Sequence, residues 1–344
     1  MILFRVDGNK HIGSGHIMRC LSIAQKARER GLDCRFCLAD DTFQAYIEEN
    51  GFPCHVLGSC YDHMSEELPK IEKLLSLLLP QLIIADSYFV TKEYLECLRQ
   101  YAKVVYIDDL AKRSYPVDAV INYNIYASQE AYERLYEGYK IRPRFLLGAR
   151  FAPLRKEFEF CPQKESVVEV KNVFISTGGA DGEHVALRLV KSLLDKPKPN
   201  KIFHFIIGGL NEDFSQIKEL ADQGKGIMLH HQVKDISRLM HTCDVAISAS
   251  GSTLYELCAC AVPTICYAVA DNQKQGNEDF CDLGLMLSAG DVRNNEHFFA
   301  DLWILFDKIC MDQALREGMA KQMRSMIDGK GTDRITQEMI KLIR

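Results

Sequence analysis

The first half of the chain alternates short apolar runs with longer segments whose apolar residues recur at helical spacing. The apolar runs predict strands at residues 2–6, 34–38, 82–85, 104–107 and 119–121. The helical spacing predicts helices at residues 16–30, 42–50, 66–79 and 92–101, with glycine or proline stop signals after the first three. Alternation of this kind predicts a parallel, doubly wound sheet.

The same alternation restarts after a polar stretch at residues 154–169, which we interpret as a linker. Strands are predicted at residues 172–176, 202–207, 227–230, 244–248 and 264–267. Helices are predicted at residues 184–194, 214–221, 235–240, 253–260 and 277–283, and three helical segments follow, the last at 332–343. We therefore expect an α/β fold with two Rossmann-like lobes, each built on a parallel sheet, and a cleft between them. The expected boundaries are 1–153 for the N-terminal lobe, 165–327 for the C-terminal lobe and 328–344 for a C-terminal helix.

Composition narrows the class of protein. A length of 344 residues suits about two domains, and 47% hydrophobic with 26% charged residues is typical of a globular protein with a normal core. The net charge of −5 argues against a nucleic-acid partner. The sequence shows neither an apolar run of membrane-spanning length nor a leader, so we expect a cytoplasmic protein without stable membrane insertion. The 13 cysteines are interpreted as reduced thiols.

Ligands of doubly wound sheets bind at the carboxyl ends of the strands. In this chain, polar or glycine-rich segments stand at those ends, at residues 7–8, 86–88, 108–109, 176–179, 249–253 and 271–273. These segments are therefore where candidate chemistry is expected.

A glycine loop with the sequence IGSGHIMRC joins the first predicted strand to the first predicted helix. Gly13 and Gly15 let the backbone approach a ligand, and the helix N-terminus directs N–H groups toward an anion. His16 lies in the first turn of that helix, and Arg19 follows one turn later. A proton carrier beside a phosphate cradle indicates chemistry on a phosphorylated substrate. The alternative is a tight turn with a surface histidine.

A dinucleotide oxidoreductase is disfavoured at this loop, because Met18 occupies the position where the fingerprint requires its third glycine. We expect neither a nucleotide cofactor nor a metal. The adjacent pair Asp108-Asp109 could hold a metal, but neighbouring side chains in extended chain point in opposite directions. We expect one of the two to cap a turn or to line the cleft instead. Tyr88 is either a core aromatic or a substrate contact.

A second glycine loop opens a helix at Ser250-Gly251-Ser252-Thr253, and Glu256 follows one turn in. Hydroxyl groups and free amides suit a phosphate, and the carboxylate can accept the two hydroxyls of a ribose. The alternative is a capping box between Thr253 and Glu256, worth about 1 kcal/mol of helix stability. Both interpretations can hold together.

Taken in order, these motifs resemble a known family. They are Arg5-Val6-Asp7, Gly13-Ser14-Gly15-His16-Ile17-Met18-Arg19, Asp86-Ser87-Tyr88, Asp108-Asp109-Leu110, Gly251-Ser252-Thr253 with Glu256, and Asp271-Asn272-Gln273. The chain resembles, over nearly its whole length, the UDP-2,4-diacetamido-2,4,6-trideoxy-β-L-altropyranose hydrolases of pseudaminic acid biosynthesis. The resemblance implies the glycosyltransferase B (GT-B) fold, similar to that of the undecaprenyl-linked UDP-N-acetylglucosamine transferase. Residues 116–124 are less typical of the family, which leaves the identity of the sugar open.

The resemblance also implies residue roles. His16 is the expected base that activates water, Tyr88 and Asn272 are expected to contact the sugar, and the backbone of Val233 to contact uracil. The loop from Gly251 to Glu256 is expected to hold diphosphate and ribose. Further expected substrate-binding residues are Arg5, Asp7, Gly13, Gly15, Arg19, Gly178, Gly179, Ser250 and Gln273.

The expected reaction is attack of water at the anomeric carbon with inversion, giving UDP and free sugar. A nucleoside diphosphate leaves as a stabilised anion, so one base can replace the carboxylate pair of ordinary glycosidases. The expected partners are a UDP-sugar and water. Two alternatives stay open: a glycosyltransferase that uses the same UDP-sugar, and a nucleotide-sugar sensor without catalysis. The oligomeric state is not predicted.

Overall fold

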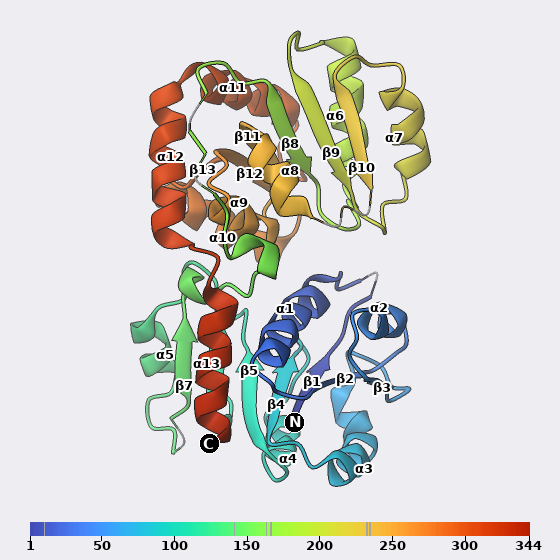
Figure 1. Ribbon diagram of the computed structural model, residues 1–344, viewed down its shortest axis with the longest axis vertical. Helices are drawn as coiled ribbons and strands as arrows, with labels where there is room; N and C mark the ends of the chain where they lie inside the picture. The colour runs from blue at the N-terminus through green and yellow to red at the C-terminus, as the bar shows by residue number, and fades with distance from the viewer. Residues whose placement is uncertain (10, 141, 163, 166, 232, 234) are drawn as a thin grey trace. The chain divides into compact units, whose positions relative to one another are not determined.

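The computed structural model describes residues 1–9, 11–140, 142–162, 164–165, 167–231, 233 and 235–344 (Figure 1). It divides the chain into two compact units. One unit comprises Met1–Lys156 and Lys330–Arg344, and the other comprises Glu157–Gly329. The sequence-based boundaries lay at 153, 165 and 327, close to these points.

The first unit is built on a seven-stranded parallel sheet with the order β3-β2-β1-β4-β5-β6-β7. Its strands are β1 (Ile2–Val6), β2 (Cys34–Leu38), β3 (Cys54–Val56), β4 (Leu82–Asp86), β5 (Lys103–Ile107), β6 (Ala119–Asn122) and β7 (Arg144–Leu147). Its α-helices are α1 (Gly15–Glu29), α2 (Gln44–Glu49), α3 (Leu68–Leu78), α4 (Lys92–Leu98), α5 (Gln129–Leu135) and α13 (Gly331–Ile343). The five predicted strands and four predicted helices are confirmed, whereas β3, β7 and α5 were missed.

Helix α13 at the end of the chain belongs to the first unit rather than standing apart from it, and it packs against α1 (Figure 1). Thr332 donates a hydrogen bond to the carbonyl oxygen of Leu154 at 2.6 Å, and Arg30 pairs with Asp333 at 2.5 Å. A Cβ atom on Gly331 would lie 2.2 Å from the carbonyl oxygen of Ala152, so this close packing requires glycine.

The second unit carries a six-stranded parallel sheet with the order β10-β9-β8-β11-β12-β13. Its strands are β8 (Asn172–Ser176), β9 (Ile202–Ile207), β10 (Ile227–His231), β11 (Val245–Ala249), β12 (Thr264–Ala268) and β13 (Met286–Asp291). Its α-helices are α6 (Val185–Asp195), α7 (Phe214–Ala221), α8 (Ile236–Thr242), α9 (Thr253–Ala259), α10 (Asp271–Asp282), α11 (Phe298–Met311) and α12 (Gln313–Met326). Strand β13 was missed, and α10 begins at Asp271 rather than at residue 277.

The central strands explain why the two sheets could be predicted. Every residue of β1, β4, β11 and β12 is buried, and apart from Arg5 and Asp86 these strands consist of apolar or small residues. The strand order reverses between β1 and β4 in the first sheet and between β8 and β11 in the second. A doubly wound sheet binds its ligands beside such a reversal, at the carboxyl ends of the strands.

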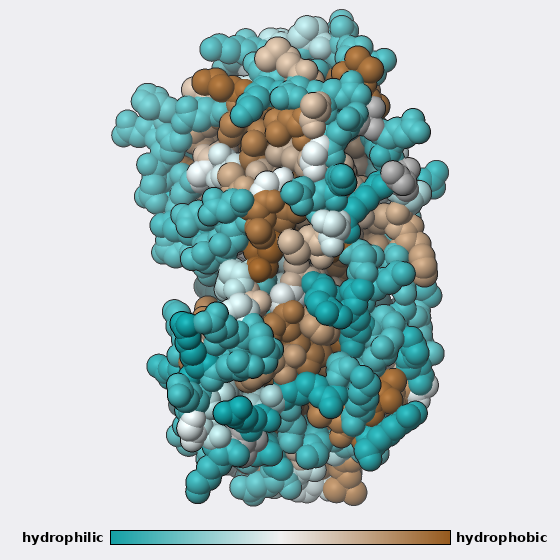
Figure 2. All heavy atoms as spheres, turned by 90° about the vertical axis from the view of Figure 1, so that its left-hand side faces the viewer, coloured by the Kyte–Doolittle hydropathy of each residue, from teal (hydrophilic) through white to brown (hydrophobic). Residues whose placement is uncertain are grey.

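The surface of the molecule is mostly polar. Polar side chains cover most of the face seen in Figure 2, and apolar side chains form small patches among them. Across the described ranges, the helices include none with both the length and the apolar character needed to cross a membrane. All 13 cysteines are free thiols.

Candidate active site

The loop after β1 places His16 at the start of α1. A Cβ atom on Gly8 would lie 2.6 Å from Cγ1 of Ile17, so glycine is needed where the chain leaves the strand. The side chain of Asn9 then accepts hydrogen bonds from the backbone N–H groups of residues 11 and 12, at 2.8 and 3.0 Å. Gly13 has a φ of +74°, which glycine adopts without strain. These features set the loop so that the helix begins at Gly15.

His16 is buried and bonded to a carboxylate at the end of β4. Its Nδ1 atom lies 2.6 Å from Oδ1 of Asp86, a residue that is 1% exposed. The ring of Tyr88 stands edge-on to the imidazole, with ring centroids 4.7 Å apart. The predicted base and the predicted sugar contact are therefore neighbours in the first unit.

Arg19 joins this group from the next turn of α1. Its Nε and Nη2 donate to the two oxygens of Asp86 at 2.7 and 2.5 Å. Its Nη1 and Nη2 donate to the two oxygens of Asp109, both at 2.8 Å, and Nη1 also donates to the hydroxyl of Tyr123 at 2.9 Å. These five contacts match the five N–H groups of a guanidinium. Direct binding of substrate by Arg19 stays a prediction.

The electrostatics of the group follow from this pairing. Burial alone would raise the pKa of Asp86, but the charge of Arg19 and the hydrogen bonds from Arg19 and His16 hold that pKa well below its usual range. Asp86 is therefore an ionised carboxylate at neutral pH. The neighbouring Cys20 thiol, 3.4 Å from Asp86, has its pKa raised by burial.

The two adjacent aspartates after β5 point in different directions, as expected. Asp108 accepts hydrogen bonds from the Tyr132 hydroxyl at 2.7 Å and from the amides of Leu110 and Ala111 at 3.0 Å. It therefore fixes a turn, whereas Asp109 faces Arg19. Within the described part of the chain, no three His, Cys, Asp or Glu side chains gather in an arrangement that could hold a metal ion.

Arg5 and Asp7 form a second buried network. Arg5 is fully buried and donates to both oxygens of Glu67, at 2.7 and 2.8 Å, and to Asp7 at 2.6 Å. Asp7 also accepts from the amide of Ala39 at 2.7 Å, and Glu67 accepts from the hydroxyl of Tyr94 at 2.5 Å. This network ties β1 to the segments after β2 and before α3, and substrate contact by Arg5 or Asp7 stays a prediction.

In the second unit, Gly178 and Gly179 are exposed after β8. Gly178 has a φ of +88°, and Gly179 packs so closely that a Cβ atom on Gly208 would lie 2.2 Å from its carbonyl oxygen. The first amides of the nearby helix α6 already have a partner, because the Asp181 carboxylate accepts hydrogen bonds from Val185 and Ala186 at 2.9 Å. A phosphate at this loop would therefore depend on the glycine backbone rather than on α6.

The second predicted phosphate site is the loop before α9. Gly251 and Ser252 are exposed, and the helix begins at Thr253 with Ser252 as its N-cap residue. The Ser252 side chain makes no capping hydrogen bond, and Thr253 is the first residue of the helix. The expected capping box of Thr253 and Glu256 stays a prediction. Ser250 is turned inward, where its hydroxyl accepts from Asn277 at 2.8 Å. Glu256 lies in the first turn of α9.

The remaining predicted contacts lie in the same unit. Asn272 is exposed in the first turn of α10, whereas Gln273 is half-buried and accepts from the amide of Val269 at 3.0 Å. Val233 follows β10 and is half-buried. Their contacts with sugar and uracil, and the cleft expected between the lobes, stay predictions.

The structure thus joins three predicted residues, His16, Arg19 and Tyr88, in one cluster. The predicted binding and catalytic residues did not include Asp86, Asp109 and Tyr123, although each lies within two residues of the end of a predicted strand. The position at a strand end was the signal in the sequence that could have identified them.

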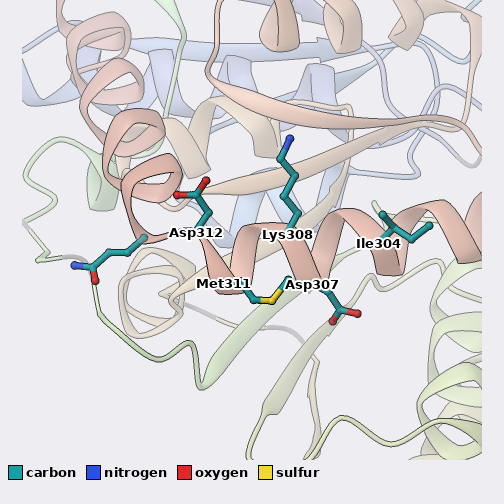
Figure 3. A pocket seen from close by; sticks show the side chains of 6 residues that line it. Ile304, Asp307, Lys308, Met311 and Asp312 are labelled. Atoms are coloured by element: carbon teal, nitrogen blue, oxygen red, sulfur yellow. The ribbon is translucent and has the colours of Figure 1, made fainter.

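A separate open hollow beside α11 is lined by Ile304, Met311 and polar neighbours (Figure 3). Its apolar residues are 67% and 80% exposed, and it includes none of the predicted site residues.

Comparison with known proteins supports the resemblance. No family model matches the chain. A Campylobacter jejuni protein named UDP-2,4-diacetamido-2,4,6-trideoxy-beta-L-altropyranose hydrolase is 28% identical over 77% of this chain and 91% of its own length. The Bacillus subtilis spore coat polysaccharide biosynthesis protein SpsG is 24% identical over 96% and 95%, respectively. The chain spans only 57% of the Methanocaldococcus jannaschii relative MJ1062.

Solved structures identify the architecture. MurG of Acinetobacter baumannii is 12% identical, with a TM-score of 0.68 and 99% coverage of both chains. The UDP-GlcNAc 2-epimerase of M. jannaschii, solved with UDP-GlcNAc and UDP, is 13% identical, with a TM-score of 0.60 over 99% of this chain and 100% of its own. The fold is the GT-B fold. At these identities the likeness to solved structures shows the fold alone, whereas the sequence relatives support the family-level resemblance.

Proposed function

We propose that this protein hydrolyses a UDP-linked 2,4-diacetamido-2,4,6-trideoxy sugar to UDP and free sugar. The proposal rests on one observation above all: His16, at the start of α1, is hydrogen-bonded to the buried carboxylate of Asp86. A histidine held in this way is suited to act as a general base toward a bound water molecule. The similarity to the C. jejuni hydrolase supports the choice of substrate.

In the proposed reaction, His16 removes a proton from water as the water attacks the anomeric carbon. The C–O bond to UDP breaks on the opposite face, so the anomeric configuration inverts. The electron pair leaves with the diphosphate, which is a stable anion and requires no protonation. A positioned base of this kind contributes roughly 10²–10⁴-fold to the rate.

We assign UDP binding to the second unit. The exposed backbone at Gly251 and Ser252 would hold the diphosphate, and Glu256 would accept the ribose hydroxyls. Asn272 and Tyr88 would contact the sugar, and the backbone of Val233 would contact uracil. Arg5, Asp7 and Arg19 would act indirectly, because their side chains are bonded within the protein.

The decisive experiment incubates the protein with a panel of UDP-sugars, without acceptor, in ¹⁸O-labelled water and excess chelator. We expect UDP and free sugar from the trideoxy substrate, with the label on the anomeric oxygen. Label in UDP or UMP would mean attack at phosphorus and would remove His16 from the proposed role. A requirement for added divalent metal would contradict catalysis by a single base and would bring Asp108 and Asp109 back as ligands.

A glycosyltransferase is the second candidate, because the fold is shared with MurG and other sugar-transfer proteins. A transferase would consume the UDP-sugar slowly alone and quickly with a sugar or lipid acceptor. The same assay, repeated with candidate acceptors, therefore separates the two. Hydrolysis at an unchanged rate with and without acceptor is the result that the proposal requires.

A further inference from the structure

The polar cluster around His16 draws on four separate segments. His16 and Arg19 belong to α1, Asp86 ends β4, Asp109 follows β5 and Tyr123 follows β6. Because β4, β5 and β6 are neighbours in the sheet, their carboxyl ends deliver these side chains to one place. Each of His16, Arg19, Asp86 and Tyr123 is buried.

The contacts around His16 Nδ1 identify which ring nitrogen carries the proton. An ionised carboxylate can only accept, so the 2.6 Å contact with Asp86 requires Nδ1 to be the donor. Arg19 Nη2 lies 3.0 Å from the same nitrogen, but a guanidinium has no acceptor and cannot receive that proton. Both donors converge on Oδ1 of Asp86, which leaves Nε2 as the basic nitrogen of the neutral ring.

The charge count of the cluster favours a proton on His16 during the reaction. Two carboxylates, Asp86 and Asp109, face one guanidinium, Arg19, so the cluster holds one uncompensated negative charge. Among the described residues, the other titratable groups close to it include Cys20, Tyr88 and Tyr123. Burial raises the pKa of each of the three, that of Tyr123 to about 12, so they stay neutral. Charges count for more in a buried site than in water.

We propose that Asp86, clamped by Arg19, is the positioning residue of His16: it fixes the Nδ1–H tautomer and stabilises the imidazolium that forms at Nε2. Arg19 takes its part through Asp86 and Asp109 rather than by touching substrate, since its five N–H groups all donate to protein atoms. The catalytic consequence rests on the proposed function, whereas the tautomer is a property of the free protein.

The tautomer is tested without any substrate. Protein labelled with ¹⁵N at histidine is examined by long-range ¹H–¹⁵N correlation spectra, and His16→Gln identifies the His16 signals. We expect a protonated Nδ1 and an unprotonated Nε2 at pH above the imidazole transition. A protonated Nε2 in the wild-type protein would overturn the inference. The tautomer is measured in the wild-type protein, and the variant serves only to assign the His16 signals.

The catalytic consequence is tested with Asp86→Asn. We expect kcat to fall by about 10²–10⁴-fold, as when a histidine base loses its orienting carboxylate, with KM changed less than about threefold. The acidic limb of the pH–rate profile should move to lower pH, because the imidazolium loses its negative neighbour. Asp118→Asn is the matched control: Asp118 pairs with Arg99 and Lys103 before β6, at the opposite end of the strand.

Three outcomes separate the inference from the proposed function. If the wild-type protein releases no sugar from any UDP-sugar, the proposed function fails while the tautomer result stands. If it is active but Asp86→Asn keeps kcat and the pH profile, the positioning role fails while the hydrolase assignment stands. Arg19→Lys keeps the positive charge but loses the planar guanidinium that bonds to two carboxylates at once. It should lower kcat and leave the UDP dissociation constant unchanged. Weaker UDP binding in Arg19→Lys would overturn the indirect role of Arg19.

Discussion

The carboxyl ends of the two sheets present polar groups in different ways. In the first unit, the residues that follow β4, β5 and β6 bond to one another and to α1 through charged side chains. In the second unit, the loops after β8 and β11 expose glycine backbone and the hydroxyl of Ser252. Side chains that are hydrogen-bonded to one another hold a proton-transfer group in one orientation, whereas exposed backbone amides can bind an anion. This difference is the basis for our proposal that chemistry and nucleotide binding are divided between the units.

The helix caps show the same division in finer detail. Thr91 and Ser128 open α4 and α5, and their hydroxyls accept from the amides of Tyr94 and Ala131. Ser14 and Ser252 open α1 and α9, the two helices of the predicted site, and their side chains make no capping hydrogen bond. A missing side-chain cap is not confined to these two helices, since Asp213 before α7 pairs with His184 and makes no capping hydrogen bond either. At α1 and α9 it leaves first-turn amides that a ligand can use.

The largest expected effect is on His16. We expect His16→Ala to lower kcat by about 10²–10⁴-fold, because the base is lost, while UDP still binds with unchanged affinity. Single-turnover kinetics and calorimetric titration with UDP measure the two quantities. A rate loss under about tenfold would remove the base role. Weaker UDP binding instead would break the division between chemistry and binding. His63→Ala is the control, since His63 is exposed and precedes α3.

The second prediction concerns the buried Arg5 network of the first unit, for which we expect a structural role. Glu67→Gln leaves the fully buried guanidinium of Arg5 without its main partner, and we expect a loss of about 3–5 kcal/mol in the free energy of unfolding. Glu130→Gln removes an exposed pair with Arg134 and should hardly move the unfolding midpoint. Denaturant unfolding followed by fluorescence and circular dichroism checks both. Equal stability of the two variants would mean that the buried network contributes nothing.

The fold was predictable where burial is complete. The central strands are short apolar runs because both faces are covered, so the sequence carries a strong signal for them. The edge strands β3 and β7 were missed because they are three and four residues long and partly exposed, and their sequences, CHV and RFLL, show no lasting alternation. Helix α5 was missed for a similar reason, since Tyr132 is its buried residue and the rest is mostly polar.

The sequence predicted which segments form the candidate site, but not which of their side chains pair with one another. The strand-end rule, applied to the sequence, pointed to residues 86–88 and 108–109. It could not show that Arg19 reaches across to both Asp86 and Asp109, because that depends on how α1 lies over the ends of β4 and β5. The inward turn of Ser250 toward Asn277 was equally hidden, since the partners are 27 positions apart.

The third prediction tests the binding side of the comparison. Glu256→Ala should weaken UDP binding by about 100-fold, because two hydrogen bonds to a charged group are lost, each worth at least about 1.5 kcal/mol. Calorimetric titration gives the affinity, and thermal unfolding reports any loosening of α9. Glu278→Ala, an exposed position of α10, is the control. Unchanged UDP affinity together with a lower unfolding temperature would leave Glu256 a structural role only.

The smallest expected effect is also the most direct test of the helix-cap observation. Ser252→Ala should weaken UDP binding by about tenfold, the lower value for one hydrogen bond to a charged group, and should leave the unfolding temperature unchanged. Thr91→Ala should do the reverse, because its hydroxyl caps α4 at 3.1 Å and such a cap is worth about 1 kcal/mol. Calorimetric titration and thermal unfolding of both variants give a crossed pair of results. If Ser252→Ala instead lowers the unfolding temperature as much as Thr91→Ala and leaves UDP affinity intact, the Ser252 hydroxyl serves the helix, and α9 loses its distinction from the capped helices of the first unit.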